Sequence, residues 1–119
     1  MTKLSRQGIK PAAAAQASEP VDLQIRFAIA NKRLVQLSYH GRVRVAEPHD
    51  YGELNHTTKL LIYQVSTSGD MRKKNPRGWR LLEVSEITEC AVLDKMFPGT
   101  RGESYKRHLA WEVVYSRVG

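Results

Sequence analysis

The chain has few residues that could crosslink a fold or coordinate a metal. Cys90 is its only cysteine, so no disulfide can form within the chain and no thiolate zinc cluster can be built from it. No apolar run approaches the roughly 18 residues that a membrane-spanning helix needs. The N-terminus also lacks the apolar region of a secretory signal. These features predict a cytoplasmic protein that does not interact with membranes.

The motifs of common enzyme classes are missing as well. The sequence contains no HExxH motif, no glycine-rich phosphate loop with its lysine and no nucleophile elbow. Glu47, His49 and Asp50 lie close together in the chain, but neighbouring residues of a strand point to opposite faces and do not converge. The remaining histidines have no evident catalytic partner in the sequence: His40, His56 and His108. We therefore predict a protein that is not an enzyme and uses no metal or other cofactor.

Positive charge is what the chain has in excess. Its 19 Lys and Arg residues outnumber 12 Asp and Glu residues, which gives a formal net charge of +7 and a pI near 9.8. Such a surface attracts phosphates and nucleic acids at neutral pH. A net charge of this size also keeps small domains soluble without any ligand. Composition alone therefore allows either an anionic partner or a solvated basic surface.

Composition divides the chain into three parts. Residues 1–19 form a basic, alanine-rich tail with little that could be buried, so we expect it to be disordered, with a short alanine-rich helix as the alternative. Residues 20–99 carry the patterned segments of one domain. Residues 100–119 are expected to pack on that domain or on a partner. Within this extension Trp111 and Tyr115 fit both helix and strand spacing, and the β-branched and aromatic content favours a strand.

A helix is expected at the start of the domain. Ile25, Ala28 and Ile29 recur at helical spacing, and the pattern begins at Val21. Two basic residues follow the last apolar one, as the negative end of the helix dipole favours. The apolar stripe of this helix needs a partner, and the following segments predict a β-sheet.

The first element of that sheet is a predicted β-hairpin. Residues 34–39 and 42–46 alternate on either side of His40 and Gly41. A two-residue loop would mix apolar and charged residues on both faces, whereas an odd-length loop separates them, and we predict the odd-length register. This register places Val35, Leu37, Tyr39, Val43 and Val45 on one face, and Gln36, Ser38, Arg42 and Arg44 on the other.

The rest of the domain is expected to be mainly β. We predict strands at residues 60–66, 79–84 and 90–93, loops at residues 52–58 and 67–77, and a short helical turn at residues 85–87. The first of these strands is a nearly continuous apolar run, which is typical of a central strand buried on both faces. The predicted core includes Leu37, Val45, Ile62 and Leu82. The fold class is therefore mainly β with an N-terminal helix, a small and partly open SH3-like or Sm-like barrel.

Three sequence segments resemble WYL domains. The stretch AIANKRLVQLSYHGRVRVAEPHDYG, from Ala28 to Gly52, resembles the opening of that family in its helix end, basic turn, strand and Glu-Pro step. The segments LLIYQVS, from Leu60, and GWRLLEVSEIT, from Gly78, resemble the name-giving and closing strands. The chain departs from the family pattern in two places: Leu60, Leu61 and Ile62 replace the Trp-Tyr-Leu signature, and Glu86 replaces a basic residue.

The resemblance covers roughly residues 21–97 and implies a ligand-sensing module. Such modules are usually attached to bacterial or phage-related regulators and are thought to recognise nucleotides or nucleic-acid ends. The winged helix that usually precedes such a domain is absent from this sequence. The resemblance therefore implies sensing of a ligand without identifying which one.

The candidate binding residues follow from side-chain chemistry. An arginine on a strand presents a rigid fork that can bind phosphate through two hydrogen bonds, which favours Arg42, Arg44 and Arg80. The predicted register places Ser38 beside Arg44, so that a hydroxyl would complete an anion cradle. These arginines could equally form a solvated face. Arg72, Lys73 and Lys74 lie in the predicted loop at residues 67–77 and would add only diffuse attraction.

Aromatic and amide side chains are the other candidates. Tyr51 and Tyr63 could stack a base, although most aromatics of small barrels are core residues. Tyr51, with His49 beside it, is expected to line an accessible edge. Tyr39 and Trp79 are assigned to the core or a pocket wall. Gln64 lies inside an apolar strand, where its amide must hydrogen-bond to a ligand or to the backbone.

Two functions remain after these steps. The first is a non-catalytic regulatory module that binds a nucleotide or a single-stranded nucleic-acid fragment on its basic face. The second is an SH3-like protein-interaction or structural module in which residues 111–115 pair with another chain. A protein partner or a homodimer fits either function.

Overall fold

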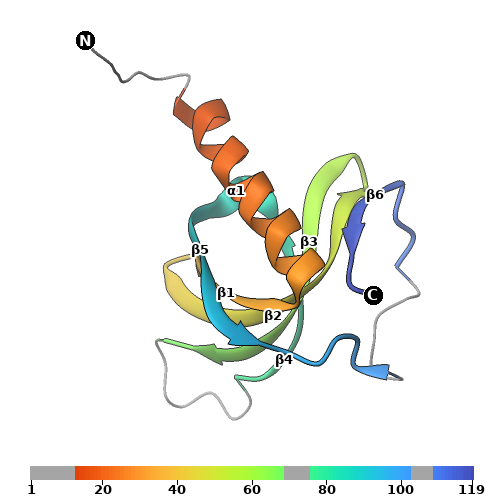
Figure 1. Cartoon of the computed structure of the whole chain (residues 1–119). Helices are drawn as coiled ribbons and strands as arrows, with labels where there is room; N and C mark the ends of the chain where they lie inside the picture. The colour runs from red at the N-terminus through yellow and green to blue at the C-terminus, as the bar shows by residue number, and fades with distance from the viewer. Residues whose placement is uncertain (1–12, 69–75, 103–108) are drawn as a thin grey trace.

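The chain folds into one N-terminal helix followed by a β-sheet (Figure 1), as a computed structural model describes for residues 13–68, 76–102 and 109–119. The described elements are α1 (Ala13–Asn31), β1 (Arg33–Tyr39), β2 (Arg42–Leu54), β3 (Thr57–Thr67), β4 (Gly78–Glu83), the 3₁₀ helix η1 (Val84–Glu86), β5 (Ile87–Met96) and β6 (Val113–Arg117). A mainly β fold with an N-terminal helix is therefore confirmed. The strand prediction for the C-terminal extension is also confirmed, because β6 falls within it.

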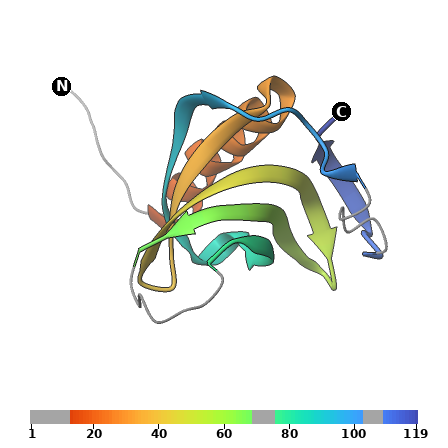
Figure 2. The same ribbon diagram turned by 90° about the horizontal axis from the view of Figure 1, so that it is seen from below.

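The sheet is antiparallel, strongly curved and open. Its strand order is β4-β3-β2-β1-β5, and β6 pairs with β2 beyond the end of β1. Figure 2 shows β2 and β3 bending along their length around the interior. In the described part of the chain β4 and β5, the two ends of this order, do not pair with each other, so the sheet is not closed into a barrel.

The core lies between α1 and one side of the sheet, here called the core face and marked by Leu37, Leu60 and Leu82. These three side chains are at most 2% exposed, and Ile25 and Ile29 of the helix are buried against the same cluster. Leu37, Ile62 and Leu82 are thus confirmed as core residues. The fourth predicted core residue, Val45, is only partly buried.

The helix begins at Ala13, earlier than the predicted start at Val21. The prediction that residues 13–19 belong to a disordered tail is therefore wrong, and the alternative of an alanine-rich helix holds for them. Alanine is the strongest helix former, and this run outweighs the cost of Pro20, which lies inside the helix and lacks a backbone donor. Residues 1–12 of the predicted tail lie outside the described residues.

The predicted register of the first hairpin is wrong. Tyr39 pairs with Arg42 and Leu37 pairs with Arg44, so the loop consists of His40 and Gly41 alone. Both loop residues have positive φ angles, 51° and 76°, as a two-residue type I′ turn requires. Arg42 and Arg44 therefore share the core face with Tyr39 and Leu37, while Ser38, Val43 and Val45 lie on the opposite side, here called the outer face.

The second hairpin also differs from its prediction. The expected loop at residues 52–58 is wrong, because β2 continues to Leu54 and β3 begins at Thr57. Asn55 and His56 form the turn with φ angles of 54° and 68°, again both positive. Gly52 lies within β2, where a Cβ would come 2.0 Å from the carbonyl oxygen of Val113. Glycine at this position therefore allows β6 to approach β2 closely.

The remaining predictions agree with the structure where it describes them. The apolar run at residues 60–66 lies in β3, between β2 and β4, with Leu60, Leu61 and Ile62 all at most 2% exposed. The predicted strands at residues 79–84 and 90–93 correspond to β4 and β5, with η1 as the turn between them. The three basic residues Arg72, Lys73 and Lys74 lie outside the described residues.

Candidate functional site

Arg44 lies on the core face near the first hairpin turn and is held by several contacts. Its Nη1 donates a hydrogen bond of 2.9 Å to Oε1 of Gln64. Its Nε and Nη2 each approach the carbonyl oxygen of Tyr39 at 3.4 Å. Its Cζ lies 5.3 Å from the centroid of the Tyr39 ring, a cation–π distance. These contacts fix both the position and the plane of the guanidinium.

Gln64 links Arg44 to the segment that enters β4. Its side chain is 2% exposed, and its Nε2 donates to the carbonyl oxygen of Pro76. The predicted need of this amide for a partner is thus met from within the chain, by Arg44 on one side and by backbone on the other. Both ends of the Gln64 amide are therefore used within the protein, where they position Arg44. The remaining N–H groups of the Arg44 guanidinium are the donors that a ligand could use.

Arg80 reaches the same region from β4. The β3–β4 register pairs Gln64 with Gly78 and Ile62 with Arg80, so Arg80 points to the core face beside Gln64. Its Nη1 donates a hydrogen bond of 2.9 Å to the carbonyl oxygen of Trp79. A Cβ on Gly78 would lie 2.9 Å from this Nη1, and the φ angle of Gly78 is +141°. Glycine at this position therefore leaves the space that the guanidinium of Arg80 occupies.

The electrostatics of Arg42, Arg44 and Arg80, here called the arginine cluster, are those of three like charges held together. Burial lowers the pKa of Arg44, and the neighbouring Arg42 and Arg80 lower it further. Among the described residues no carboxylate forms an ion pair with any of the three. Other arginines of the fold do have such partners: Arg26 with Asp22, Arg33 with Asp94, Arg101 with Glu47, and Arg117 with Asp50. The cluster is thus a concentration of positive charge that lacks an acidic partner in the described ranges.

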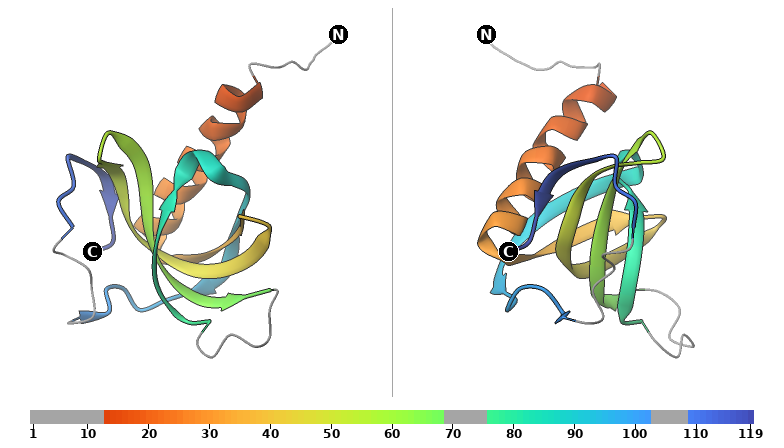
Figure 3. Two further views of the ribbon diagram at one scale, coloured as in Figure 1. Left: turned by 180° about the vertical axis from the view of Figure 1, so that it is seen from behind. Right: turned by 90° about the vertical axis from the view of Figure 1, so that its right-hand side faces the viewer.

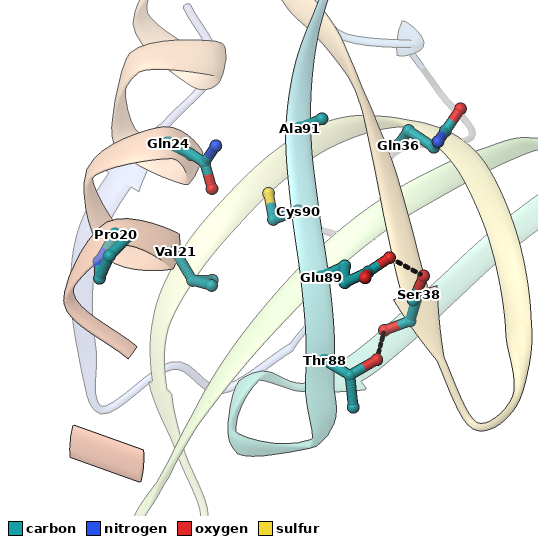
Figure 4. Close-up of a pocket in the computed structure, with 9 residues that line it drawn as sticks. All are labelled: Pro20, Val21, Gln24, Gln36, Ser38, Thr88, Glu89, Cys90 and Ala91. Carbon is teal, nitrogen blue, oxygen red and sulfur yellow. Dashed lines mark hydrogen bonds between the residues drawn. The ribbon is translucent and has the colours of Figure 1, made fainter. Parts of the chain in front are cut away.

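Ser38 does not belong to this cluster. It lies on the outer face, where its Oγ donates to Glu89 and its carbonyl oxygen accepts a hydrogen bond from Thr88 (Figure 4). Together with residues of α1 and β5 it lines a cavity of about 450 Å³ beside the sheet edge. The prediction that Ser38 lies beside Arg44 is wrong because it depended on the odd-length hairpin register.

His49 and Tyr63 are buried or covered on the outer face, away from the arginine cluster. His49 is fully buried, with ring centroids 4.8 Å from Trp79 and 5.5 Å from Phe97, and its Nδ1–H donates to the carbonyl oxygen of Glu47. Burial lowers the pKa of His49, so the imidazole is neutral at pH 7. The Tyr63 ring packs edge-on against Trp79, and the Arg101 guanidinium lies 3.6 Å from its centroid. The two candidate binding residues His49 and Tyr63 therefore belong to a packed aromatic cluster with Trp79 and Phe97.

Tyr51 is also a structural residue, contrary to the prediction of an accessible edge. Its side chain is on the core face, the residue is 3% exposed, and its hydroxyl donates a hydrogen bond of 2.6 Å to Asp22. It therefore fastens α1 to β2. Burial, followed by the hydrogen bond to Asp22, raises the pKa of Tyr51 well above its usual range.

The Tyr51 hydroxyl gives a testable stability difference. Tyr51→Phe is expected to lower the free energy of unfolding at pH 7 by about 1.5 kcal/mol, since a hydrogen bond to a carboxylate is lost. The raised pKa means that the folded protein retains this proton where an unfolded tyrosine, with a pKa of about 10, loses it. The contribution is therefore complete below about pH 10 and falls as the pH rises further. Urea unfolding at pH 7 and pH 10.5 should show the difference between parent and variant narrowing, and a constant difference would contradict it.

The sequence predicts the three arginines of the site and its glutamine, but not the backbone groups that hold them. The Tyr39 and Pro76 carbonyls and the space at Gly78 carry no side-chain signature. The one available signal for these groups is Gly78, which directly precedes Trp79 and Arg80 in the sequence. It indicates space for a guanidinium only once the strand register shows that Gly78 pairs with Gln64.

Comparisons with known proteins add no relative. No family model matches the chain, and no curated protein or solved structure matches it significantly. Across residues 13–68, 76–102 and 109–119, no three His, Cys, Asp or Glu side chains are grouped as a metal site would need. No helix in these ranges has the length and hydropathy to span a membrane. What the site binds is therefore inferred from its own geometry and charge.

Proposed function

We propose that this domain is a non-catalytic sensor that binds a phosphate group of a nucleotide or a single-stranded nucleic-acid end at the arginine cluster. The observation that carries the proposal is that Arg42, Arg44 and Arg80 lie together on the core face without a carboxylate partner in the described chain, whereas four other arginines have one. Holding three like charges together costs free energy, and a bound phosphate would offset that cost.

The geometry favours a phosphate held in one orientation. Arg44 uses Nη1 toward Gln64 and Nη2 toward Tyr39, and Arg80 uses Nη1 toward Trp79. Each terminal nitrogen carries two N–H groups, so both guanidiniums retain donors after these bonds are made. Because protein contacts already fix the plane of Arg44 and one hydrogen bond restrains Arg80, less side-chain entropy remains to be lost on binding.

A base-stacking surface lies beside the cluster. The His40 ring stacks on Tyr39 with a centroid separation of 4.0 Å and an interplanar angle of 16°, and its side chain is 58% exposed. Arg44 packs on the same Tyr39 ring. His40 therefore replaces Tyr51 and Tyr63 as the aromatic group that we expect to contact a nucleobase. The WYL resemblance implies the same class of ligand, and a cytoplasmic regulator is the setting that we propose for it.

Arg44 tests this proposal most directly. Arg44→Gln is expected to weaken binding of a 5′-phosphorylated single-stranded oligonucleotide by about 10- to 150-fold, the equivalent of a lost charged hydrogen bond. Arg44→Lys should restore little, since lysine keeps the charge and loses the planar fork. Fluorescence anisotropy with labelled oligonucleotide and mononucleotide at two salt concentrations measures both.

The matched control for Arg44 is Lys95→Gln. Lys95 is an exposed residue of β5 and its substitution removes the same charge, so binding should stay within about twofold of the parent at constant salt. If Arg44→Gln and Lys95→Gln lose the same oligonucleotide affinity, or if Arg44→Lys binds like the parent, the arginine cluster attracts anions only through its net charge. The protein-interaction module would then replace the sensor as the proposed function.

Gly78 provides a second prediction at the same site. Gly78→Ala is expected to weaken oligonucleotide binding about tenfold, because the new methyl group would occupy the position 2.9 Å from Arg80 Nη1 and turn the guanidinium away. Gly99→Ala is the control, since Gly99 has a comparable φ angle of +127° and a Cβ there would meet Gly119 and Lys32 rather than an arginine. Both variants should lose stability through backbone strain, measured by urea unfolding. Weakened binding in both would show that strain, rather than Arg80, is responsible.

A further inference from the structure

A cavity lined by five elements lies on the core face. Its volume is about 550 Å³, larger than the cavity beside Ser38. The lining residues come from α1, β2, β3, η1 and β6: Asp22, Arg26, Tyr51, Thr58, Val84, Ser85 and Tyr115. The right-hand view of Figure 3 shows α1 and β6 running side by side. None of the lining residues belongs to the arginine cluster, so this cavity is a separate site.

Arg26 is oriented within this cavity by its neighbours. Its Nε lies 3.0 and 3.1 Å from the two oxygens of Asp22, one helical turn earlier. Its Cζ lies 5.1 Å from the Tyr115 ring centroid and 5.6 Å from that of Tyr51. Within the described chain, Nη1 and Nη2 of Arg26 make no hydrogen bond. The side chain is 44% exposed, so these two nitrogens remain available as a pair of parallel donors.

Parallel donors of this kind match a carboxylate or a phosphate, and the surrounding charges distinguish the two. The Asp22 carboxylate contributes one negative charge at the cavity wall. It accepts hydrogen bonds from Arg26 and from the Tyr51 hydroxyl. Glu53 lies close by, bonded to the Tyr115 hydroxyl. A dianionic phosphate would face repulsion from both carboxylates, whereas a monoanion faces less. The charges therefore favour a monocarboxylate.

The remaining lining indicates what the carboxylate is attached to. Tyr115 and Val84 present apolar surface, and the hydroxyls of Thr58 and Ser85 can bond to polar substituents. An apolar or aromatic body would be buried against that surface while its carboxylate reaches Arg26.

We propose that this cavity binds a small organic monocarboxylate with an apolar or aromatic body, and that Arg26 holds the carboxylate through Nη1 and Nη2. Asp22 is a positioning residue, because it fixes Arg26 through Nε. This site is independent of the phosphate site at the arginine cluster.

Benzoate is the probe for this proposal, with benzamide as its neutral counterpart and phenyl phosphate as its dianionic one. Titration followed by amide chemical shifts should show saturable benzoate binding, with shifts centred on α1 and β6. Benzamide and phenyl phosphate should bind at least tenfold more weakly. Equal binding of all three would overturn the carboxylate assignment, and the absence of benzoate binding would overturn the site.

Variants of Arg26 test the residue assignment. Arg26→Gln should abolish benzoate binding, and Arg26→Lys should weaken it at least fivefold although it keeps the charge. Ser85→Leu provides a second test that leaves Arg26 and Asp22 in place, because it fills the cavity from η1 and should also block benzoate. Retained parental binding in Arg26→Gln or in Ser85→Leu would contradict the proposal.

Arg44→Gln is the matched control at the other site. It removes a guanidinium from the arginine cluster and should leave benzoate binding unchanged, while Arg26→Gln should leave oligonucleotide binding within about twofold. Loss of benzoate binding in Arg44→Gln would mean that the carboxylate enters the arginine cluster instead. Failure of either site would thus be visible without failure of the other.

Discussion

Leu37→Ala is expected to lower the free energy of unfolding by about 2 to 5 kcal/mol, one of the largest effects of a single substitution in this fold. Leu37 is 0% exposed on β1, in the middle of the cluster that joins the sheet to α1. Truncation would remove buried methyl groups and leave a cavity that the surrounding strands cannot fully close. Urea unfolding monitored by circular dichroism measures the loss.

Val45→Ala is the control for Leu37→Ala, because the two hairpin registers predict different losses of unfolding free energy for it. The odd-length hairpin register would place Val45 on the same face as Leu37, whereas the structure places it on the outer face and only partly buried. Its truncation should therefore cost about 1 kcal/mol or less. Similar losses in the two variants would mean that the two-residue turn at His40 and Gly41 is incorrect.

The locations of the strands could be predicted from the sequence because their signals are local. Alternation, apolar runs and turn residues placed β3, β4, β5 and β6 within a few residues of their observed bounds. The first hairpin was predicted with the wrong loop length, because separation of apolar from charged residues favoured an odd-length loop whereas Arg42 and Arg44 share the core face with Tyr39 and Leu37. The second turn was missed, because Asn55 and His56 both adopt positive φ angles, as His40 does in the first. Histidine adopts that conformation too rarely for sequence alone to favour a two-residue turn.

The site was predictable only as far as side-chain chemistry reaches. The binding chemistry of their side chains predicts Arg44, Arg80 and Gln64 as site residues, and the structure brings these three together. The prediction of Ser38 as a site residue depends on the odd-length hairpin register and is wrong because that register is wrong. The burial of Tyr63 depends on Arg101, which comes from a distant segment and covers the ring. No local pattern indicates that the chain after β5 returns to the outer face.

Two carboxylates of β2 bind the part of the chain that follows β5. Glu47 is 5% exposed and accepts two hydrogen bonds of 2.8 Å from Arg101. Asp50 is fully buried and bonds to Nε and Nη2 of Arg117, the last residue of β6. The C-terminal extension therefore stabilises the domain by packing on it. In the described chain β6 pairs with β2, so the segment predicted to pair with another chain is used within the fold.

Arg117→Met is expected to lower the free energy of unfolding by about 3 kcal/mol, because it removes the two hydrogen bonds that the Arg117 guanidinium donates to the fully buried Asp50 carboxylate. The control is Asp94→Asn, which breaks an arginine–aspartate pair of the same 3.0 Å separation whose carboxylate is fully exposed. Water solvates that carboxylate in both states, so Asp94→Asn should cause no measurable loss. The two pairs differ mainly in burial, and equal losses would mean that Asp50 is solvated in the native protein.

A double-mutant cycle separates the ion pair from the packing of Arg117. Adding Asp50→Asn to Arg117→Met removes the buried negative charge that Arg117 no longer balances, so the double variant should be more stable than Arg117→Met alone. Hydrogen exchange should then show the amides of β6 protected again, since their bonds to β2 would no longer compete with hydration of the Asp50 carboxylate. If the double variant is instead less stable than Arg117→Met, the Asp50 carboxylate stabilises the native state through contacts other than its bonds to Arg117, and the ion pair is not the reason for the loss in Arg117→Met.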